Sequence, residues 1–211
     1  MDKVKIYGNP ISRSISNIWA ALELGIEYEN VSIGWSDNSI YSEQYRRINP
    51  NARVPALRDG DFIMWESLAI NLYLVKKHGG PLAPKDLHEE ARAFQWSLWA
   101  AIHLERPLMQ WLFNTHVLEP EERRPALAEK ALKEMKPLLT ILDGQLERAP
   151  YLAGDRFTVA DLNVGCVMLR PRQELDLSAY PRLYKWDKAV FERPAARQAW
   201  AIRVEAASHP A

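Results

Sequence analysis

One stretch of the chain, residues 49–74, constrains the fold more than any other because several turn and helix signals follow one another there. Asp59-Gly60 stands between two apolar runs, which is a strong signal for a tight β-hairpin. The pattern predicts antiparallel strands over residues 56–58 and 62–65. From Glu66-Ser67 onward, apolar residues recur at helical spacing, which predicts a helix to about Lys77.

The two ends of this hairpin predict a backbone surface that binds a peptide. Pro55 stands at the start of the first strand, and a bond preceding proline is the common setting for a cis peptide. A cis Val54-Pro55 bond would turn the N–H and C=O of Val54 outward. The helix that starts at Glu66-Ser67 offers free N–H groups and the positive end of its dipole, which favour anions. Together these features predict a site for a peptide with a free carboxylate.

The order of these features resembles a known family. The run NPNARVPAL from Asn49 to Leu57, a hairpin, and WES at the head of a helix are similar to the glutathione-binding half of the cytosolic glutathione transferases. The resemblance implies an α/β thioredoxin-like N-terminal domain, in the order βαβ, short helix, ββα with a cis-proline, plus an all-α helical-bundle C-terminal domain. The segment WSLW at 96–99 and the order of the helices resemble a bacterial, serine-type subgroup.

The N-terminal residues fit the first part of this order. Residues 4–7 are predicted to form a strand, residues 12–24 a helix that ends at Gly25, and residues 28–33 a second strand parallel to the first. Gly79-Gly80-Pro81 and Pro84 then interrupt all periodicity, which places a linker at 78–87. We therefore expect a glutathione-binding domain at 1–78 and a helical domain carrying the electrophile site at 88–205.

The second half has helical patterns throughout. Pro107 lies inside the first of them and predicts a kink. Thr158 and Asp161 form a capping-box pattern, for which we favour a structural role, and the same box in the transferases extends the resemblance to this domain. The tail from 206 to 211 is expected to be frayed. The predicted helices cover residues 87–114, 119–148, 181–191 and 194–205, with a further helix that has Thr158 as its N-cap and contains the apolar run 162–169.

Composition excludes several function classes. Cys166 is the single cysteine, so one chain cannot form a disulfide framework or a CxxC redox pair. Lys and Arg total 27, as do Asp and Glu, which leaves no net charge to attract nucleic acid or an anionic membrane. No apolar run has the length of a signal peptide or a membrane span, and no cluster has metal-ligand spacing. We expect a cytoplasmic protein that acts on small molecules without a metal. Eight tryptophans indicate large apolar surfaces for an interface or a ligand groove.

The chemistry of a glutathione enzyme begins with its thiol. An ordinary thiol has a pKa near ~8.5 and is mostly protonated at neutral pH, so a hydroxyl donor at a helix start would favour the reactive thiolate. Ser12 lies where the first predicted helix begins, the place that holds the catalytic residue in the family. Many bacterial relatives carry asparagine two positions after the catalytic serine, whereas this chain has Ser14 there. Ser14 is therefore the alternative, with the roles of the two positions exchanged. An ordinary helix cap is the other interpretation of Ser12.

The resemblance also implies a set of glutathione ligands. Val54 would pair its backbone with the cysteinyl group, and Pro55 would hold the cis turn. Glu66 would take the γ-glutamyl amine and Ser67 the γ-glutamyl carboxylate. Arg53 is a candidate for the glycyl carboxylate, with a solvated loop cation as the alternative.

The electrophile is expected between the loop at Ile11 and the first helix of the second domain. His103, Pro107 and Trp111 are spaced four residues apart and share a helix face, with Arg106 beside them. A structural stripe is the competing interpretation of these residues.

Three functions remain in competition at this point. The first is a glutathione transferase that conjugates glutathione, as a cosubstrate, to small hydrophobic electrophiles, with glutathione peroxidase activity as an additional candidate. The second is a non-catalytic relative that binds proteins or serves a stress response. The third, a cysteine-type thiol reductase, is disfavoured because Cys166 lies in an apolar helix far from position 12. The family resemblance also implies a homodimer.

Overall fold

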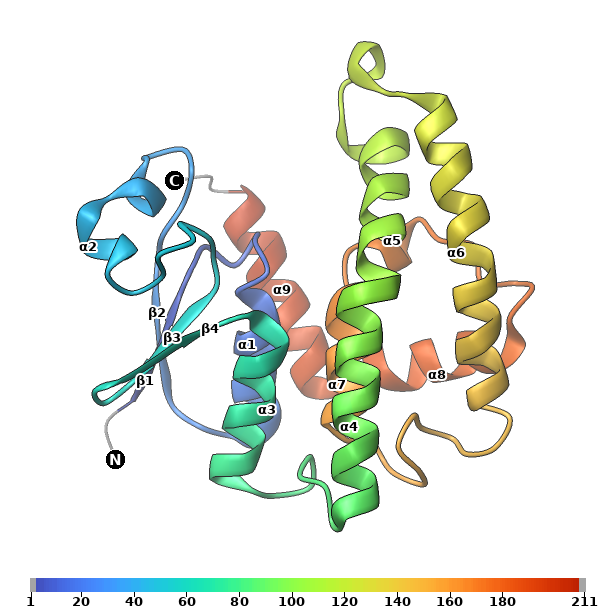
Figure 1. Ribbon diagram of the computed structural model, residues 1–211, viewed down its shortest axis with the longest axis horizontal. Helices are drawn as coiled ribbons and strands as arrows, with labels where there is room; N and C mark the ends of the chain where they lie inside the picture. Colours follow the sequence, from blue (N-terminus) through green and yellow to red (C-terminus); the bar gives the residue numbers. More distant parts are fainter. Residues whose placement is uncertain (1–2, 209–211) are drawn as a thin grey trace. The chain divides into compact units, whose positions relative to one another are not determined.

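The computed structural model describes residues 3–208 and divides into two units. Figure 1 shows a small sheet with its helices, formed mainly by the first part of the chain, and a set of helices formed by the middle of the chain. Among the described residues, unit 1 comprises residues 3–83 and 192–208, and unit 2 comprises residues 84–191. The two units are described separately below.

Unit 1 is built on a four-stranded mixed sheet with strand order β2-β1-β3-β4. Strands β1 and β2 are parallel, whereas β3 is antiparallel to both β1 and β4. The predicted crossover and hairpin are therefore confirmed, although β2 is shorter than predicted. The strand bounds are Val4–Tyr7 (β1), Tyr28–Val31 (β2), Ala56–Asp59 (β3) and Phe62–Trp65 (β4).

The helices of unit 1 include α1 (Ile15–Leu24), α3 (Ser67–His78) and α9 (Pro194–Ser208), and α1 contacts both of the others. A 3₁₀ turn (Ser39–Tyr41) and α2 (Glu43–Arg46) form the predicted short irregular helix. Helix α1 ends at Gly25, whose φ of 64° is left-handed. It begins at residue 15 rather than 12, because the serine hydroxyls ahead of it bond to backbone in a turn instead.

The last helix, α9, groups with unit 1, whereas the prediction placed it in the helical domain. Arg193, just before α9, donates two hydrogen bonds to the carboxylate of Glu23 on α1, at 2.8 and 2.7 Å. The Glu23 side chain is only 5% exposed. A helical pattern does not reveal which distant element a helix packs on, so the sequence did not indicate this arrangement.

Unit 2 consists of helices, with α7 buried along its whole length. Two π-helical turns interrupt the long helix predicted over 87–114. Pro107 has no N–H to donate, and the first π turn lies just before it. The bounds are α4 (Leu87–Trp99), η2 (Ala100–Leu104), α5 (Glu105–Leu112), η3 (Phe113–Val117), η4 (Pro120–Glu122), α6 (Pro125–Gln145), α7 (Val159–Met168), η5 (Pro171–Gln173) and α8 (Pro181–Phe191).

The start of α6 and the end of α9 also differ from the predicted bounds. Helix α6 begins at Pro125 rather than at 119, because the residue before a proline avoids the helical region and Arg124 is extended (φ −114°, ψ 92°). Helix α9 continues to Ser208, three residues into the tail predicted to be frayed. Residues 209–211 lie outside the described residues.

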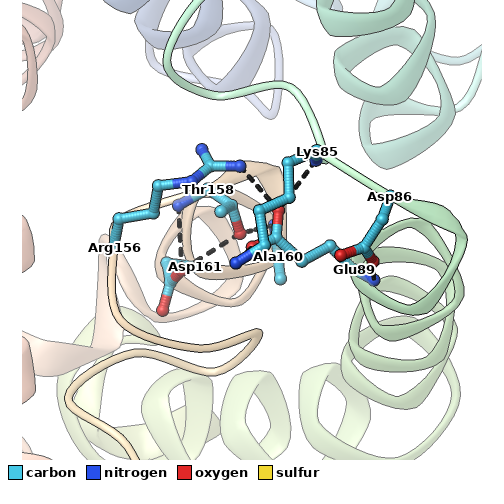
Figure 2. A network of polar contacts seen from close by, with 7 residues as sticks. All are labelled: Lys85, Asp86, Glu89, Arg156, Thr158, Ala160 and Asp161. Carbon is cyan, nitrogen blue, oxygen red and sulfur yellow. Dashed lines mark hydrogen bonds and ion pairs between the residues drawn. The ribbon is translucent and has the colours of Figure 1, made fainter.

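The capping box at the head of α7 is confirmed. The Asp161 carboxylate accepts hydrogen bonds from the N–H groups of Thr158 and Leu152 and from the Trp186 indole. Burial raises the pKa of Asp161 to about 6 in spite of these donors. Figure 2 shows this box beside a second polar group, in which Glu89 of α4 pairs with Arg156 at 2.6 Å. The box therefore has a structural role, fixing the entry of α7 within unit 2.

Candidate functional site

The loop between β1 and α1 carries both candidate serines, and their surroundings differ. The Ser12 hydroxyl donates to the C=O of Asn9 at 2.6 Å and remains partly exposed. The Ser14 hydroxyl donates to the same C=O at 2.7 Å, but Ser14 is fully buried. Only Ser12 is therefore placed to meet a ligand that arrives from solvent.

Gly8 brings this loop close to the turn that contains the cis-proline. Its φ is 135°, and a Cβ at this position would lie 2.8 Å from the Cβ of Ser14 and 3.0 Å from the Cβ of Val54. A larger residue would clash with both, so this close approach requires glycine. The serine loop and the Val54-Pro55 turn are thereby neighbours, which makes a shared binding surface possible.

The Val54-Pro55 peptide bond is cis, as predicted. The preceding C=O, that of Arg53, accepts hydrogen bonds from the Tyr45 hydroxyl and the Asn49 amide, both at 2.7 Å. Burial raises the pKa of Tyr45, so its hydroxyl stays protonated and can donate. Within residues 3–208, no hydrogen bond involves the N–H or C=O of Val54. These two groups are therefore available to pair with an extended peptide.

The loop before the cis-proline keeps a left-handed turn without glycine. Ala52 has a φ of 50°, a conformation that costs an alanine roughly 1–2 kcal/mol. The Arg53 side chain that follows is exposed and has no partner among the hydrogen bonds and ion pairs of the described chain. Arg53 is consequently available to an anionic ligand.

The head of α3 combines an exposed residue with a buried one. Glu66 has a φ of 77° and a ψ of 110°, a strained conformation that is rare outside glycine. Glu66 is exposed, whereas Ser67 is 8% exposed. The first N–H groups of the helix have no intrahelical acceptor, and they carry the positive end of the dipole. This geometry suits a ligand that has both an amine and a carboxylate.

Asn17 of α1 and Arg13 of the turn before it, which the sequence patterns did not single out, contact this helix start. The Asn17 amide donates to the C=O of Ser67 at 2.8 Å and to the side chain of Asn71 at 2.7 Å, and so ties α1 to α3. The Arg13 guanidinium donates to the Ser67 hydroxyl at 3.3 Å. Ser67 lies 54 positions from Arg13, so no local pattern could report this contact.

The candidate electrophile residues lie in both units. Ile11 of unit 1 is 39% exposed. In unit 2, His103 and Arg106 are exposed and Trp111 is partly exposed, whereas Pro107 is buried. The described residues contain no group of three His, Cys, Asp or Glu side chains that could hold a metal. None of the described helices is long and apolar enough to cross a membrane.

Comparison with protein-family models identifies both parts of the chain. The model of the glutathione S-transferase N-terminal domain matches residues 2–76, and that of the C-terminal domain matches residues 104–194. The chain belongs to the glutathione S-transferase family. The thioredoxin-like sheet followed by a helical domain is thereby confirmed. The predicted enzyme class, a glutathione transferase, is confirmed as well.

Individual relatives align with this transferase over nearly its whole length. Glutathione S-transferase GstB of Escherichia coli K12 is 30% identical over 206 residues, which are 95% of this chain and 99% of that protein. Glutathione S-transferase 3 of Zea mays is 29% identical over 208 residues, 92% of each chain. The solved structure of the theta class enzyme of Xanthomonas axonopodis pv. citri with glutathione bound is 28% identical, with a TM-score of 0.87, and the alignment covers 94% of this chain and 97% of that one.

Proposed function

We propose that unit 1 binds glutathione extended between the serine loop, the Val54-Pro55 turn and the head of α3, and that Ser12 activates its thiol. The observation that carries this proposal is the contrast between the two serines: Ser12 is partly exposed, and Ser14 is buried. The unpaired backbone groups of Val54 would bind the cysteinyl group on one side of Ser12. The cysteinyl sulfur is then brought to the Ser12 hydroxyl.

The head of α3 binds the γ-glutamyl end in this proposal. Ser67 and the first-turn N–H groups receive the carboxylate, and Glu66 receives the amine. Arg13 joins the site because its guanidinium lies 3.3 Å from the Ser67 hydroxyl and adds a positive charge where the carboxylate would bind. Arg53, at the opposite end of the peptide, would pair with the glycyl carboxylate.

Activation of the thiol requires one change of hydrogen-bond partner. The Ser12 hydroxyl now donates to the neutral C=O of Asn9 at 2.6 Å. An anionic sulfur is a stronger acceptor than a neutral carbonyl, so a bound thiolate would attract the same proton. The Asn9 C=O would retain the Ser12 N–H at 2.9 Å and the Ser14 hydroxyl, so the exchange leaves no orphaned acceptor.

The glutathione thiol releases its proton to solvent, and the resulting thiolate attacks a small hydrophobic electrophile. With an aryl halide, the sulfur electron pair forms the new carbon–sulfur bond and the halide departs with the electrons of the broken bond. In unit 2, the electrophile contacts are proposed to come from His103, Arg106 and Trp111. Pro107, whose side chain is buried, would act by shaping the helix.

Calorimetric titration with glutathione tests the binding site. Arg13→Met and Ser67→Ala are expected to weaken binding about 10-fold each, because each removes a group near the carboxylate. Arg197→Met and Thr140→Ala are matched controls at exposed positions and should bind normally. Unchanged affinity in both Arg13→Met and Ser67→Ala would remove this assignment.

We also propose that the enzyme is a homodimer that uses the exposed face of α4 and η2. Leu87, Phe94, Leu98 and Ile102 share one side of this helix and are 75%, 49%, 60% and 65% exposed. Such a continuous apolar stripe is typical of an interface. Leu98→Glu should yield a monomeric mass in light scattering, while Thr140→Glu in α6 should not. A monomeric wild-type enzyme at micromolar concentration would refute the proposal.

A further inference from the structure

Arg203 of α9 reaches the loop that carries Ser12. Its Nη1 atom donates to the C=O of Pro10 at 3.3 Å and also to the C=O of Ile11. The two residues are 193 and 192 positions away from it in the chain. Helix α9 therefore contacts the two residues immediately before the serine proposed to activate glutathione.

We propose that Arg203 is a positioning residue, which holds the Pro10-Ile11 backbone so that the Ser12 hydroxyl points at the glutathione sulfur. This inference rests on the proposed function of Ser12. One amino group of the guanidinium makes both contacts, because Nη1 carries two N–H groups and the planar guanidinium fixes their directions toward the two adjacent carbonyl groups.

The Ser12 and Ser14 hydroxyls bond to the Asn9 C=O and to each other, whereas Pro10 and Ile11 have few restraints besides Arg203. Asn9 provides them: its side chain accepts from the Ile11 N–H at 3.0 Å, and its C=O accepts from the Ser12 N–H at 2.9 Å. Pro10 has no N–H to contribute. Arg203 supplies the restraint from the other side, so without it the two carbonyl groups would turn to water and the loop would gain freedom. A displacement of about 1 Å at a reacting group can cost roughly 100-fold in rate.

The docking of α9 does not depend on Arg203. The pair between Arg193 and the largely buried Glu23 fixes the beginning of the helix to α1, and the Trp19 indole donates to the same carboxylate at 3.1 Å. A substitution at position 203 should therefore loosen the loop while the helix remains in place. This separation makes the proposal testable without unfolding unit 1.

A positive charge near the loop is a second way in which Arg203 would favour the thiolate. Arg13, the other cation of this loop, directs its guanidinium to Ser67 instead. Arg203→Lys separates the two contributions, since lysine keeps the charge but loses the planar guanidinium that fixes the direction of the Nη1 hydrogens. If positioning dominates, the lysine variant should resemble Arg203→Met more than the wild type.

The experiment measures the pKa of enzyme-bound glutathione from thiolate absorbance, together with turnover of an aryl halide, glutathione affinity and melting temperature. Arg203→Met should raise the thiol pKa by about one unit and lower kcat/KM about 10–100-fold at neutral pH, with affinity and melting temperature nearly unchanged. Arg197→Met, which removes an exposed charge from the same helix, should match the wild type.

The double variant Ser12→Ala/Arg203→Met decides between positioning and other roles. If Arg203 acts through Ser12, its replacement should change the thiol pKa little once the hydroxyl is gone. If the two substitutions raise the thiol pKa additively, Arg203 does not act by positioning Ser12. The same conclusion follows if Ser12→Ala raises the thiol pKa and Arg203→Met leaves it unchanged. If Ser12→Ala itself leaves the pKa unchanged, the proposed function fails first.

Discussion

Ser12→Ala and Ser14→Ala should have opposite consequences, although the two serines are neighbours that bond to the same Asn9 C=O. Ser12 is partly exposed, so its hydroxyl can leave this carbonyl for a ligand. Ser14 is 0% exposed and packs against Gly8, so its hydroxyl is confined to the protein. We therefore expect Ser12→Ala to impair catalysis and Ser14→Ala to impair stability.

The magnitudes follow from the number of donors that each variant removes. Loss of one donor to a full or developing anion costs ~3 kcal/mol, which corresponds to roughly 100-fold in rate. For Ser12→Ala this predicts a rise of about 2 units in the pKa of bound glutathione. Ser14→Ala removes one of several donors to the Asn9 C=O, so the free energy of unfolding should fall by about 1 kcal/mol with little change in the thiol pKa.

The assay combines three measurements on each variant. Thiolate absorbance against pH reports the thiol pKa, aryl halide conjugation reports turnover, and urea unfolding reports stability. Glutathione affinity should stay nearly intact in Ser12→Ala, because the peptide is held by Val54 and the head of α3 in the proposed complex. A raised thiol pKa in Ser14→Ala alone would move the catalytic role two residues along the chain. An unchanged pKa in both variants would refute serine activation.

Two further predictions concern stability. Ala52 has a φ of 50°, so Ala52→Gly should raise the free energy of unfolding by about 1 kcal/mol. The control, Ala56→Gly in strand β3, should lower the free energy of unfolding. A destabilised Ala52→Gly variant would contradict the backbone argument. Burial raises the pKa of Asp161 from 3.8 to about 6. The folded protein therefore binds more protons than the unfolded chain between these two pH values. The stability that protonated Asp161 contributes is present at low pH and lost as pH rises through about 6. Relative to Asp161→Asn, the wild type should therefore lose about 1.4 kcal/mol of unfolding free energy between about pH 5 and pH 7.5, and parallel stability curves for the two proteins would show that Asp161 does not titrate in this range.

Local signals determined much of what the sequence predicted correctly. The Asp59-Gly60 hairpin, the helix end at Gly25 and the Thr158–Asp161 box each depend on interactions within a few residues of the chain. The cis bond before Pro55 was predicted for the same reason, since only its immediate neighbour decides whether such a bond is accessible. These signals, taken in order, were sufficient for the family and for the architecture of both domains.

The tertiary structure decided which side chains meet. Ser14 is buried close to Gly8 whereas Ser12 is partly exposed, and this distinction depends on contacts that only the fold creates. The contact of Arg13 with Ser67 joins residues 54 positions apart, and the contacts of Arg203 with the Ser12 loop join residues more than 190 apart. Helical periodicity identifies the face that a helix buries but not the element that covers it. For this reason the helical pattern of residues 194–205 did not show that α9 packs on α1, and the contact of Arg203 with the serine loop emerged only from the folded chain.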